Sequence, residues 1–325
     1  MYDMLQKTRL LRPEIMLVNN PNTVLILLAA YKGNTYVREQ IDSILNQDCD
    51  NWKLVLSDDG DFTKKILDSY ANRFPDKIIR YRSGQRFGSA KAHFMHLIAH
   101  FKDAAPYIML SDQDDVWDVD KVSKTFALMK ATEKTYDGPV LVHTDLRIVD
   151  AELNEISLSF FAYSKLEKRR YHPHEILIQN LVSGCTLMMN RSLSNLVSCG
   201  VNPDKLVMHD HWIALVAAFF GKIAFLDTPT MRYRQHGDNT CGAKPLFSPS
   251  YMLAAARRSN FRPLSFQAEA FKAYYGSRLS PDDARILDAV ALLHTLNKFA
   301  RLATYRRFDL WKSPLVRKIG QIFLW

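Results

Sequence analysis

Val24-Leu25-Ile26-Leu27-Leu28-Ala29 is a continuous apolar run, and it sets the pattern of the first half of the chain. A run of this kind predicts a β-strand that is buried on both faces, as the strands of parallel sheets are. Residues 34–47 follow and carry Val37, Ile41 and Ile44 at the spacing of one helix face. The sequence therefore predicts a strand followed by a helix that packs back onto it.

The same alternation repeats along the residues that follow. Strands that alternate with helices of this length indicate βαβ units. We therefore predict an α/β fold with a mostly parallel, Rossmann-like central sheet. Beyond residue 150 the alternation weakens. The strands are predicted at 53–57, 77–82, 107–110, 140–142, 185–190 and 223–226, and the helices at 62–74, 88–101, 119–131 and 210–220.

The end of the chain differs from the rest in charge. Between Pro249 and Trp325 there are 13 Lys and Arg residues against 5 Asp and Glu residues, an excess of +8 out of the formal net charge of +9. The pattern there is helical, with breaks expected at Pro263, Pro281 and Pro314. We expect three regions in all, which are an N-terminal arm over 1–22, a sheet-bearing domain over 23–245 and a basic helical region over 246–325.

Two interpretations of the basic region stay open. Its mixture of basic and aromatic residues beside a near-neutral domain fits an anionic lipid surface. A nucleic-acid-binding domain is more often basic around its recognition element, so we expect no nucleic acid partner. The alternative is a helical subdomain that packs on the core.

The composition favours a folded protein of a reducing compartment. Apolar residues make up 47% and charged residues 24% of the chain, which is ordinary for soluble proteins. The four cysteines are widely spaced and form no C-x-x-C pair, which argues against a zinc or disulfide framework. No stretch has the roughly 18–20 apolar residues of a membrane span, and no signal peptide is recognised. We expect a cytoplasmic protein, with peripheral contact at the inner face of the cell membrane as a further expectation.

Polar residues follow the predicted strands. In open α/β sheets, ligands bind beyond the carboxyl ends of the strands, so these residues are the first candidates for a site. They are Ala30-Tyr31-Lys32, Asp58-Asp59-Gly60, Asp112-Gln113-Asp114-Asp115 and His143-Thr144-Asp145.

The acidic string at 112–115 is the strongest signal. Asp112, Asp114 and Asp115 are three carboxylates within four residues, and they repel one another unless a cation lies among them. Mn²⁺ and Mg²⁺ prefer oxygen ligands and often bridge a carboxylate to substrate phosphates. The string therefore predicts a divalent-metal site. The alternative is a solvated acidic turn that caps the next helix.

Two further segments fit a nucleotide. A carboxylate at Asp58 or Asp59 can accept hydrogen bonds from a pyrimidine N–H or from ribose hydroxyls, although Asp-Gly pairs are also common in plain turns. The stretch 84–91 holds two glycines and ends in Lys91 at a predicted helix start, where an anion is favoured. Its spacing is not that of a P-loop.

Residues near the later elements complete the candidate site. Asp210 opens an apolar helix, where it serves either as a cap or as a general base for an acceptor hydroxyl. A zinc site from His209 and His211 is disfavoured because residues two apart on a helix point in different directions. Arg234 is a candidate for phosphate contact. His236 is a candidate metal ligand, with a structural role as the alternative.

Taken in order, these segments resemble the family 2 glycosyltransferases with the A-type nucleotide-sugar fold. The resemblance covers residues 23–240, and it points to bacterial rhamnosyltransferases and hexosyltransferases of surface-polysaccharide assembly. The matching stretches are Leu28-Ala29-Ala30-Tyr31, Glu39-Gln40-Ile41-Asp42-Ser43-Ile44-Leu45-Asn46-Gln47, Ser57-Asp58-Asp59-Gly60, Ser111-Asp112-Gln113-Asp114-Asp115-Val116-Trp117 and Tyr233-Arg234-Gln235-His236.

The resemblance implies a role for each matching position. Asp112 and Asp114 would form the metal-binding D-x-D pair, with Asp114 the direct ligand and His236 the C-terminal metal-binding histidine. Ser183-Gly184 would form the glycine loop near the acceptor, and Asp210 would be the catalytic base. The donor side would be lined by Ala30, Tyr31, Glu39 and Asp58, and we also expect donor contacts from Asp59, Lys91, Asp112, Gly184 and Arg234.

Two positions depart from the family pattern. The first strand ends in Ala30-Tyr31-Lys32, where Thr or Ser, Tyr and Asn are usual. The residue before Asp210 is His209, where Glu is usual. The second departure bears on the geometry of the acceptor side.

The resemblance implies an inverting glycosyltransferase that depends on Mn²⁺ or Mg²⁺. It would transfer rhamnose or a hexose from dTDP-rhamnose or a UDP-hexose to a saccharide or polyprenyl-linked acceptor in bacterial surface-polysaccharide synthesis. Two other interpretations stay open. One is a nucleotidyltransferase that acts on sugar phosphates, and the other is a non-enzymatic basic protein that binds membranes or polyanions.

Overall fold

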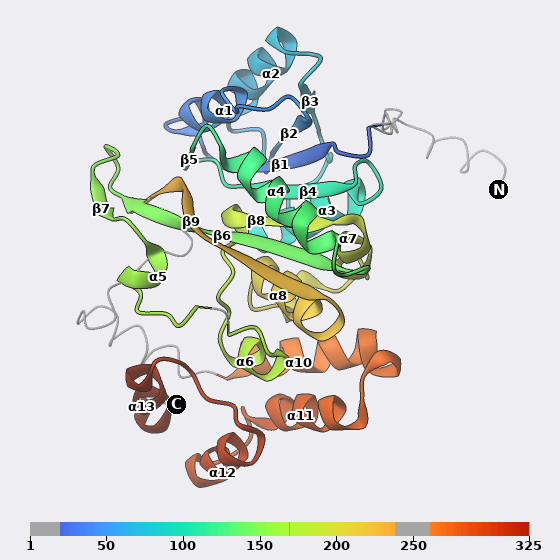
Figure 1. Ribbon diagram of the computed structural model, residues 1–325, viewed down its shortest axis with the longest axis vertical. Helices are drawn as coiled ribbons and strands as arrows, with labels where there is room; N and C mark the ends of the chain where they lie inside the picture. The colour runs from blue at the N-terminus through green and yellow to red at the C-terminus, as the bar shows by residue number, and fades with distance from the viewer. Residues whose placement is uncertain (1–19, 169, 238–260, 325) are drawn as a thin grey trace, which may run out of the picture.

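The computed structural model describes residues 20–168, 170–237 and 261–324 (Figure 1). A single nine-stranded sheet runs through the upper part of the molecule, in the order β3-β2-β1-β4-β8-β6-β9-β5, with β7 paired to β6. The strands are β1 (Val24–Ala30), β2 (Trp52–Asp58), β3 (Ile78–Arg80), β4 (Tyr107–Ser111), β5 (Val116–Trp117), β6 (Val140–Val149), β7 (Glu155–Ser157), β8 (Leu187–Asn190) and β9 (Lys222–Arg234).

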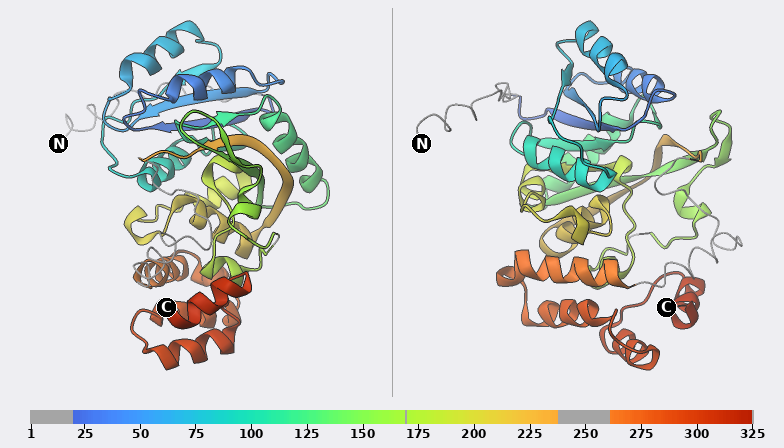
Figure 2. Two further views of the ribbon diagram at one scale, coloured as in Figure 1. Left: turned by 90° about the vertical axis from the view of Figure 1, so that its left-hand side faces the viewer. Right: turned by 180° about the vertical axis from the view of Figure 1, so that it is seen from behind.

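The helices cover both faces of the sheet and extend below it (Figure 2). Side chains of α1, α2 and α4 pack on one face, and those of α3, α7 and α8 pack on the other. The helices are α1 (Val37–Leu45), α2 (Lys64–Arg73), α3 (Ala90–Phe101), α4 (Lys121–Glu133), α5 (Phe160–Tyr163), α6 (Pro173–Ile178), α7 (Arg191–Val197), α8 (His209–Phe220), α10 (Arg262–Tyr275), α11 (Pro281–Leu292), α12 (Lys298–Phe308) and α13 (Leu315–Leu324).

The parallel half of the sheet is as the sequence predicts. β1 pairs in parallel with β2 and β4, and β2 pairs in parallel with β3. Leu25 and Leu27 of β1 face the core under α3 and α8, whereas Ile26 and Leu28 face the core under α1 and α4. A strand with a core on each side needs apolar residues at every position, which is why β1 is a continuous apolar run.

The second half of the sheet differs from simple βαβ repetition. β8 is inserted between β4 and β6 and is antiparallel to both. β6 and β9 run much further than the predicted strands at 140–142 and 223–226, and β5 is an additional short strand antiparallel to β9. These extensions contain polar residues on one face, such as Arg147 and Arg232, so an apolar run marks only their first part.

The C-terminal helices pack on the sheet-bearing region. Pro263 and Pro281 lie in the first turns of α10 and α11, and Pro314 precedes α13, so each proline marks a helix start. Phe271 of α10 stacks on Phe220 of α8, with ring centroids 5.8 Å apart. α10, α11 and α12 therefore extend the core below α3, α7 and α8, as the packed-subdomain interpretation expects for them.

The predicted arm at 1–22 and the predicted boundary at 245/246 fall largely outside the described residues, so this division of the chain stays a prediction. In the parts of the chain that the structure describes, each helix is too short or too polar to cross a membrane. Cys49, Cys185 and Cys199 are free thiols there.

Candidate active site

The carboxyl ends of β1, β2 and β4 meet at one rim of the sheet. Ala30 is the register partner of Asp58, and Leu28 is the partner of Ser111. The backbone N–H of Asp59 donates to the carbonyl of Ala30 at 2.8 Å. Because these strands are parallel and in register, the residues that follow each of them gather at the same edge.

Tyr31 forms one wall of this rim. Its backbone N–H donates to Gln113 Oε1 at 2.7 Å, and Gln113 Nε2 donates to the Tyr31 carbonyl at 2.8 Å. The Tyr31 ring meets the Phe62 ring edge to face, with centroids 5.3 Å apart, and both rings are nearly half exposed. The Lys32 ammonium lies 5.3 Å from the Tyr31 ring centroid. This wall offers aromatic surface and a cation, which suit a nucleotide.

Asp58 and Asp59 have different environments although they are adjacent. Asp58 accepts the N–H of Thr63 at 2.6 Å with Oδ2, whereas its buried Oδ1 has no partner among the described residues. Burial raises the pKa of Asp58. Asp59 accepts the N–H groups of Phe87 and Gly88, at 2.7 and 2.8 Å, and so holds the glycine-containing loop before α3. Asp58 retains an acceptor for a ligand, and Asp59 fixes the loop.

The acidic string lies in one cluster with residues of later segments. Carboxylate oxygens of Asp112 and Asp115 and the Cys185 sulfur lie within 4.8 Å of one another. Asp115 is fully buried, and its Oδ2 lacks a partner within the described chain. Burial, with the charges of Asp114 and Asp210, raises the pKa of Asp112 to about 7. Burial and its acidic neighbours also hold the pKa of Asp115 well above its usual range.

Asp114 and His236 are in direct contact. His236 Nε2 lies 2.8 Å from Asp114 Oδ2, and each side chain is 14% exposed. The His236 ring lies 5.0 Å from that of Tyr36, between centroids. This contact joins the segment after β9 to the acidic string, as the sequence predicts for these two residues.

The donor atoms of the cluster fit a hard divalent cation. Asp112 and Asp114 supply carboxylate oxygens and His236 supplies an imidazole, which are ligands that Mn²⁺ accepts. Burial raises the pKa of the Cys185 thiol, which keeps it neutral and makes it a poor ligand for such an ion. The unpaired Oδ2 of Asp115 indicates that the protein itself does not fully compensate the buried charge.

Lys121 is a buried cation near the cluster. It is fully buried, and its Nζ donates to Thr230 Oγ1 at 3.3 Å and lies 4.8 Å from the Trp117 ring centroid. Burial lowers its pKa to about 8, against the opposing effect of Cys185, Asp115 and other acids. Lys121 therefore offsets part of the charge of Asp115 from behind the cluster.

Asp210 opens α8 and reaches the turn at Gly184. Its carboxylate accepts the backbone N–H of His211 at 2.6 Å, and the nearby backbone N–H of Gly184 also lowers its pKa. Burial raises the pKa of Asp210 to about 6, even though these N–H groups stabilise the charged form. The charge of Asp210 also raises the pKa of Asp112, so the two carboxyl groups repel each other electrostatically. A carboxylate suited to accept a proton thus lies beside the acidic cluster.

Arg234 is buried and paired within the protein, whereas a phosphate contact was expected for it from the sequence. Its side chain is 2% exposed and pairs with Glu39, and its Nε donates to the Asp114 carbonyl at 2.9 Å. The guanidinium also lies over the Tyr36 ring, 4.3 Å from the centroid. These contacts place Arg234 and Glu39 as supports of the acidic string. Their direct contact with a donor stays a prediction.

Lys91 also has a partner within the protein. It lies in the first turn of α3, and its Nζ donates to the carbonyl of Leu206 at 3.0 Å. This bond joins α3 to the segment that precedes α8. Whether Lys91 exchanges the bond for a phosphate is untested, and its donor role stays a prediction.

Most candidates from the sequence lie around one rim, and the sequence reasoning missed several contributors, Phe62 among them. Asp112, Asp114, Asp210 and His236 come together as predicted from separate segments. Gln113, Lys121 and Cys185 were not singled out. Gln113 stands inside the acidic string and Cys185 follows Gly184, so sequence position gave a signal for these two, whereas nothing marked a buried lysine at the start of α4.

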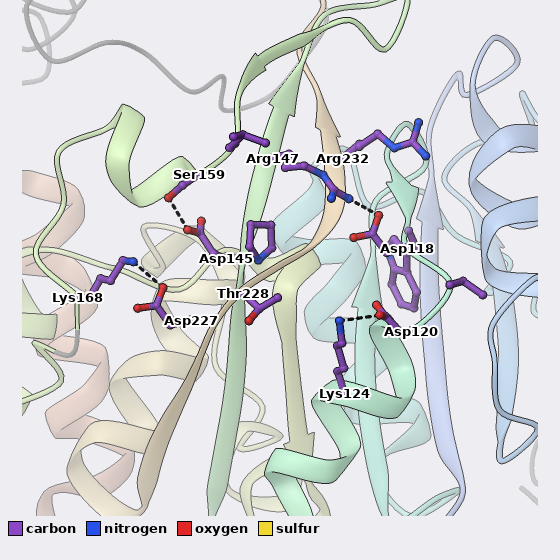
Figure 3. Close-up of a pocket in the computed structure, with 14 residues that line it drawn as sticks. Asp118, Asp120, Lys124, Asp145, Arg147, Ser159, Lys168, Asp227, Thr228 and Arg232 are labelled. Carbon is purple, nitrogen blue, oxygen red and sulfur yellow. Dashed lines mark hydrogen bonds and ion pairs between the residues drawn. The ribbon is translucent and has the colours of Figure 1, made fainter.

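A separate polar hollow of about 810 Å³ lies on the sheet beside β5, β6 and β9 (Figure 3). Of the candidates named from the sequence as residues that follow a strand, Asp145 lines it, whereas Asp112, Asp114, Asp210 and His236 do not. Its acids have partners within the protein: Asp118 pairs with Arg147, Asp120 with Lys124, and Asp227 with Lys168. The carboxylate of Asp145, part of the motif His143-Thr144-Asp145, bonds to Ser159 and to backbone N–H groups of Leu146 and Phe160.

Comparison with known proteins places the chain in a family. The model of "Glycosyl transferase family 2" matches residues 25–197, which is more than half of the chain. The dTDP-rhamnosyl transferase RfbG of Shigella flexneri is 25% identical over 237 residues, which cover 69% of this chain and 76% of that protein. The putative glycosyltransferase EpsE of Bacillus subtilis is 29% identical over 117 residues, which cover 35% of this chain and 40% of that protein.

Solved structures share the fold at low sequence identity. TarS 1–349 of S. aureus in complex with UDP-GlcNAc aligns with a TM-score of 0.54 at 13% identity, over 92% of this chain and 90% of that one. The mannosyltransferase PcManGT of Pyrobaculum calidifontis, in complex with GDP-Man and Mn²⁺, aligns with a TM-score of 0.52 at 17% identity, over 97% and 84%. The family match, the fold and the acidic rim agree, and the chain belongs to glycosyl transferase family 2.

Proposed function

We propose that this enzyme is an inverting, metal-dependent transferase that moves rhamnose or a hexose onto a saccharide or a polyprenyl-linked acceptor in bacterial surface-polysaccharide synthesis. The observation that carries the proposal is the group of buried, incompletely compensated carboxylates beside Asp210 at the strand-end rim. A site of this kind accommodates the diphosphate of a nucleotide sugar when a divalent cation is present.

Asp112, Asp114 and His236 are the residues proposed to hold the cation. When bound, Mn²⁺ or Mg²⁺ supplies positive charge for the diphosphate that departs. Asp115 stays behind this set, where the Arg234 N–H and Lys121 compensate part of its charge. Glu39 and Arg234 keep the string in place, because the Arg234 side chain bonds to the Asp114 carbonyl.

Asp210 is the proposed base. Its pKa of about 6 leaves it mostly ionised at neutral pH, so it can accept a proton. In the proposed step, the acceptor oxygen forms a bond to the anomeric carbon from the side opposite the diphosphate. The bond from that carbon to the diphosphate oxygen breaks, the nucleoside diphosphate leaves, and the acceptor proton passes to Asp210. One displacement inverts the configuration at the anomeric carbon.

The donor nucleotide is proposed to lie against Tyr31, Phe62 and Asp58. The free Oδ1 of Asp58 can accept a hydrogen bond from a pyrimidine N–H or a ribose hydroxyl. The relationship to a dTDP-rhamnosyl transferase makes dTDP-rhamnose the first choice, and a UDP-hexose is the second. Thymine and uracil present the same N–H group, so Asp58 does not choose between them.

A donor screen tests the proposal. Hydrolysis and transfer are measured for a panel of dTDP-, UDP- and GDP-sugars with Mn²⁺, with Mg²⁺ and with EDTA. We expect one nucleoside-diphosphate sugar to be consumed only with a divalent cation. The variant D114N should lose this activity, and D120N is the matched control because Asp120 pairs with Lys124 in the separate hollow. Turnover of every donor in EDTA would contradict the proposal.

The products separate the proposal from its two rivals. A nucleotidyltransferase acting on sugar phosphates would release pyrophosphate from a nucleoside triphosphate, whereas the proposed enzyme releases a nucleoside diphosphate. A non-enzymatic basic protein would bind polyanions in a salt-sensitive way and would keep that binding in D114N. The gathering of acidic residues and a candidate base, Asp210, at one rim favours the transferase over both the nucleotidyltransferase and the non-enzymatic protein.

A membrane contact is proposed for α13. Leu315, Val316 and Ile319 lie on one side of this helix and are 68%, 40% and 46% exposed. Its other side is held by Gln321, which bonds to the backbone of Lys312 and Leu310. An anchored helix with an exposed apolar strip suits the interface of a bilayer.

Basic residues of α12 and α13 favour an anionic surface. Arg306 and Arg307 are exposed at the end of α12, and the Lys318 ammonium lies 4.5 Å from the Trp311 ring centroid. Positive charge of this kind is attracted to anionic lipid headgroups. We propose that the enzyme docks peripherally on the inner face of the cell membrane, where a polyprenyl-linked acceptor would be found.

Vesicle flotation tests the membrane contact. The triple variant L315S/V316S/I319S should float poorly with vesicles of phosphatidylglycerol and phosphatidylcholine, yet retain transfer to a soluble acceptor. The matched control is I156S/L158S, which changes exposed residues of the β7 hairpin. Deletion of α12 and α13 is unsuitable because Tyr305 and Leu310 are buried in the core. Equal flotation of wild type and the triple variant would exclude α13 as the docking helix.

A further inference from the structure

His209 is a buried histidine that lacks hydrogen bonds within the described chain. It is the first residue of α8, it is 6% exposed, and both of its ring nitrogens are without a partner there. Burial lowers its pKa to about 3, so the ring is neutral at physiological pH. Because an unpaired buried polar group costs stability, packing contacts must hold the ring in place.

The ring lies between Phe94 and Gly184. It stacks on the Phe94 ring of α3, with centroids 4.5 Å apart and an interplanar angle of 30°. On the side of Gly184, a Cβ added to the glycine would lie 2.6 Å from His209 Nε2. This separation is shorter than any ordinary non-bonded contact, so a residue larger than glycine at position 184 would force the His209 ring to move.

Gly184 is also a neighbour of Asp210, because its backbone N–H stabilises the charged form of that carboxylate and lowers its pKa. The three residues therefore form a closed unit. The His209 ring packs against Gly184, the Gly184 N–H stabilises the charge of Asp210, and Asp210 directly follows His209 on α8. Any shift of the ring moves the glycine, and with it the donor that orients the carboxylate.

We propose that His209 is a positioning residue that orients Asp210 by fixing Gly184, and that it contacts neither donor nor acceptor. This inference rests on the proposed function of Asp210 as the base. It explains how a chain with histidine in place of the usual glutamate before Asp210 still orients the Asp210 carboxylate. The ring acts through its shape, because it has no hydrogen bond to contribute within the described residues.

A size-exchange experiment tests the inference. The variants G184A, H209A and the double variant G184A/H209A are compared in transfer kcat, donor KM and melting temperature. Each single variant should lower kcat by about tenfold to a hundredfold, the range expected when a catalytic group is misplaced, with donor KM nearly unchanged. The double variant should be more active than G184A, since the new methyl group enters the space that the ring has left.

Two controls accompany this cycle. G276A adds a methyl group where the nearest atom is 3.9 Å away, at the Cγ of Lys272, and should behave as wild type. H209L replaces the ring by an apolar group of similar volume and should retain more activity than H209A. H209L also keeps the inference testable if H209A does not fold, because loss of all activity in a folded H209L variant would show that the ring nitrogens are required and would overturn the inference.

The remaining outcomes are equally decisive. Wild-type kcat in H209A, or effects in the double variant that are the product of the single effects, would show that the ring does not position Asp210. A raised acceptor KM in H209A with unchanged kcat would place the ring in contact with the acceptor instead. D210N is assayed in parallel. If D210N is active, the proposed base is wrong, whereas an inactive D210N with a normal H209A refutes only the role of His209.

Discussion

Two acidic regions of this protein differ in how their charge is compensated. In the hollow of Figure 3, Asp118, Asp120 and Asp227 each pair with an arginine or lysine of the same surface. At the strand-end rim, Asp112 and Asp115 are crowded by other acids, and burial raises their pKa. Both regions are rich in aspartate, yet only the second is incompletely compensated.

The difference separates structural from functional acids. A carboxylate with a cation of its own contributes a modest ion pair at the surface. Buried carboxylates without one are unfavourable, and they persist where a ligand completes the site. An acid-rich string therefore indicates a metal site only when its buried carboxylates are not paired with basic side chains of the protein.

The largest expected effect comes from the rim acids. D112N and D114N should each lower transfer by at least about a hundredfold, because the charge that balances the leaving diphosphate would be lost. D118N and D120N, in the hollow, should remain close to wild type. The measurement is the initial rate with saturating donor and Mn²⁺. Equal losses in both pairs of variants would remove the distinction between the two regions.

Replacement of the base should have an effect of similar or slightly smaller size. D210N should lower kcat by about a hundredfold to ten-thousandfold, since a positioned general base contributes that much, while donor binding stays nearly intact. Calorimetry with the donor nucleotide checks the second part. Normal turnover in this variant would show that another group accepts the proton.

The pH dependence of transfer should report Asp210. Its pKa is raised to about 6 and the reaction needs the ionised carboxylate, so kcat/KM should rise with pH through about 6 and then level off. A soluble acceptor assayed between pH 5 and pH 8 gives the profile. A rate that is flat across this window would contradict the assignment.

The stability of the metal-free protein should fall as pH rises. Folding raises the pKa of Asp112 from 3.8 to about 7, so the folded state binds this proton more tightly than the unfolded state does. Stability is therefore highest below pH 4 as far as this group is concerned, and on the order of 4 kcal/mol is lost as pH rises towards 7. Melting curves in EDTA measure the loss, which D112N should reduce and Mn²⁺ should reverse at pH 8. An unchanged pH dependence in D112N would assign the loss to other groups.

The smallest effect is expected in the hollow. D227N breaks an ion pair between side chains that are 39% and 48% exposed, so the free energy of unfolding should change by about 0–1 kcal/mol. Chemical denaturation of the variant checks this value, with Mn²⁺ and with EDTA. A change that depends on the metal would show that the hollow and the rim are coupled.

The sequence predicted the parallel half of the fold because each element there has a simple pattern. β1, β2 and β4 are buried on both faces and appear as apolar runs, and β1 and β2 are each followed by an amphipathic helix. The extended part of β6 was missed because it contains the buried polar residues His143, Thr144 and Asp145, and that of β9 because it is half-exposed and contains polar residues. The short β5 has only two residues. The antiparallel placement of β8 depends on long-range pairing that local pattern does not encode.

The sequence identified the acidic residues of the candidate site, but it did not reveal which basic residues neutralise their charge. Asp112, Asp114, Asp210 and His236 were identified from motif order, and the fold brings them together. Except for the local pair of Asp120 with Lys124, the partners of the acids in the hollow come from residues distant in sequence. Lys121 is buried by contacts with β9 and the Trp117 ring, a fact that its position in the chain does not reveal.

Titration of Mn²⁺ into the protein with saturating dTDP or UDP is the most direct test of the difference between the two acidic regions. The wild-type protein and the D118N/D120N variant should each bind one ion with the same affinity, and the D112N/D114N variant should lose that site. Equal Mn²⁺ binding by all three proteins, or loss of binding in the hollow variant alone, would contradict the assignment of the rim as the metal site.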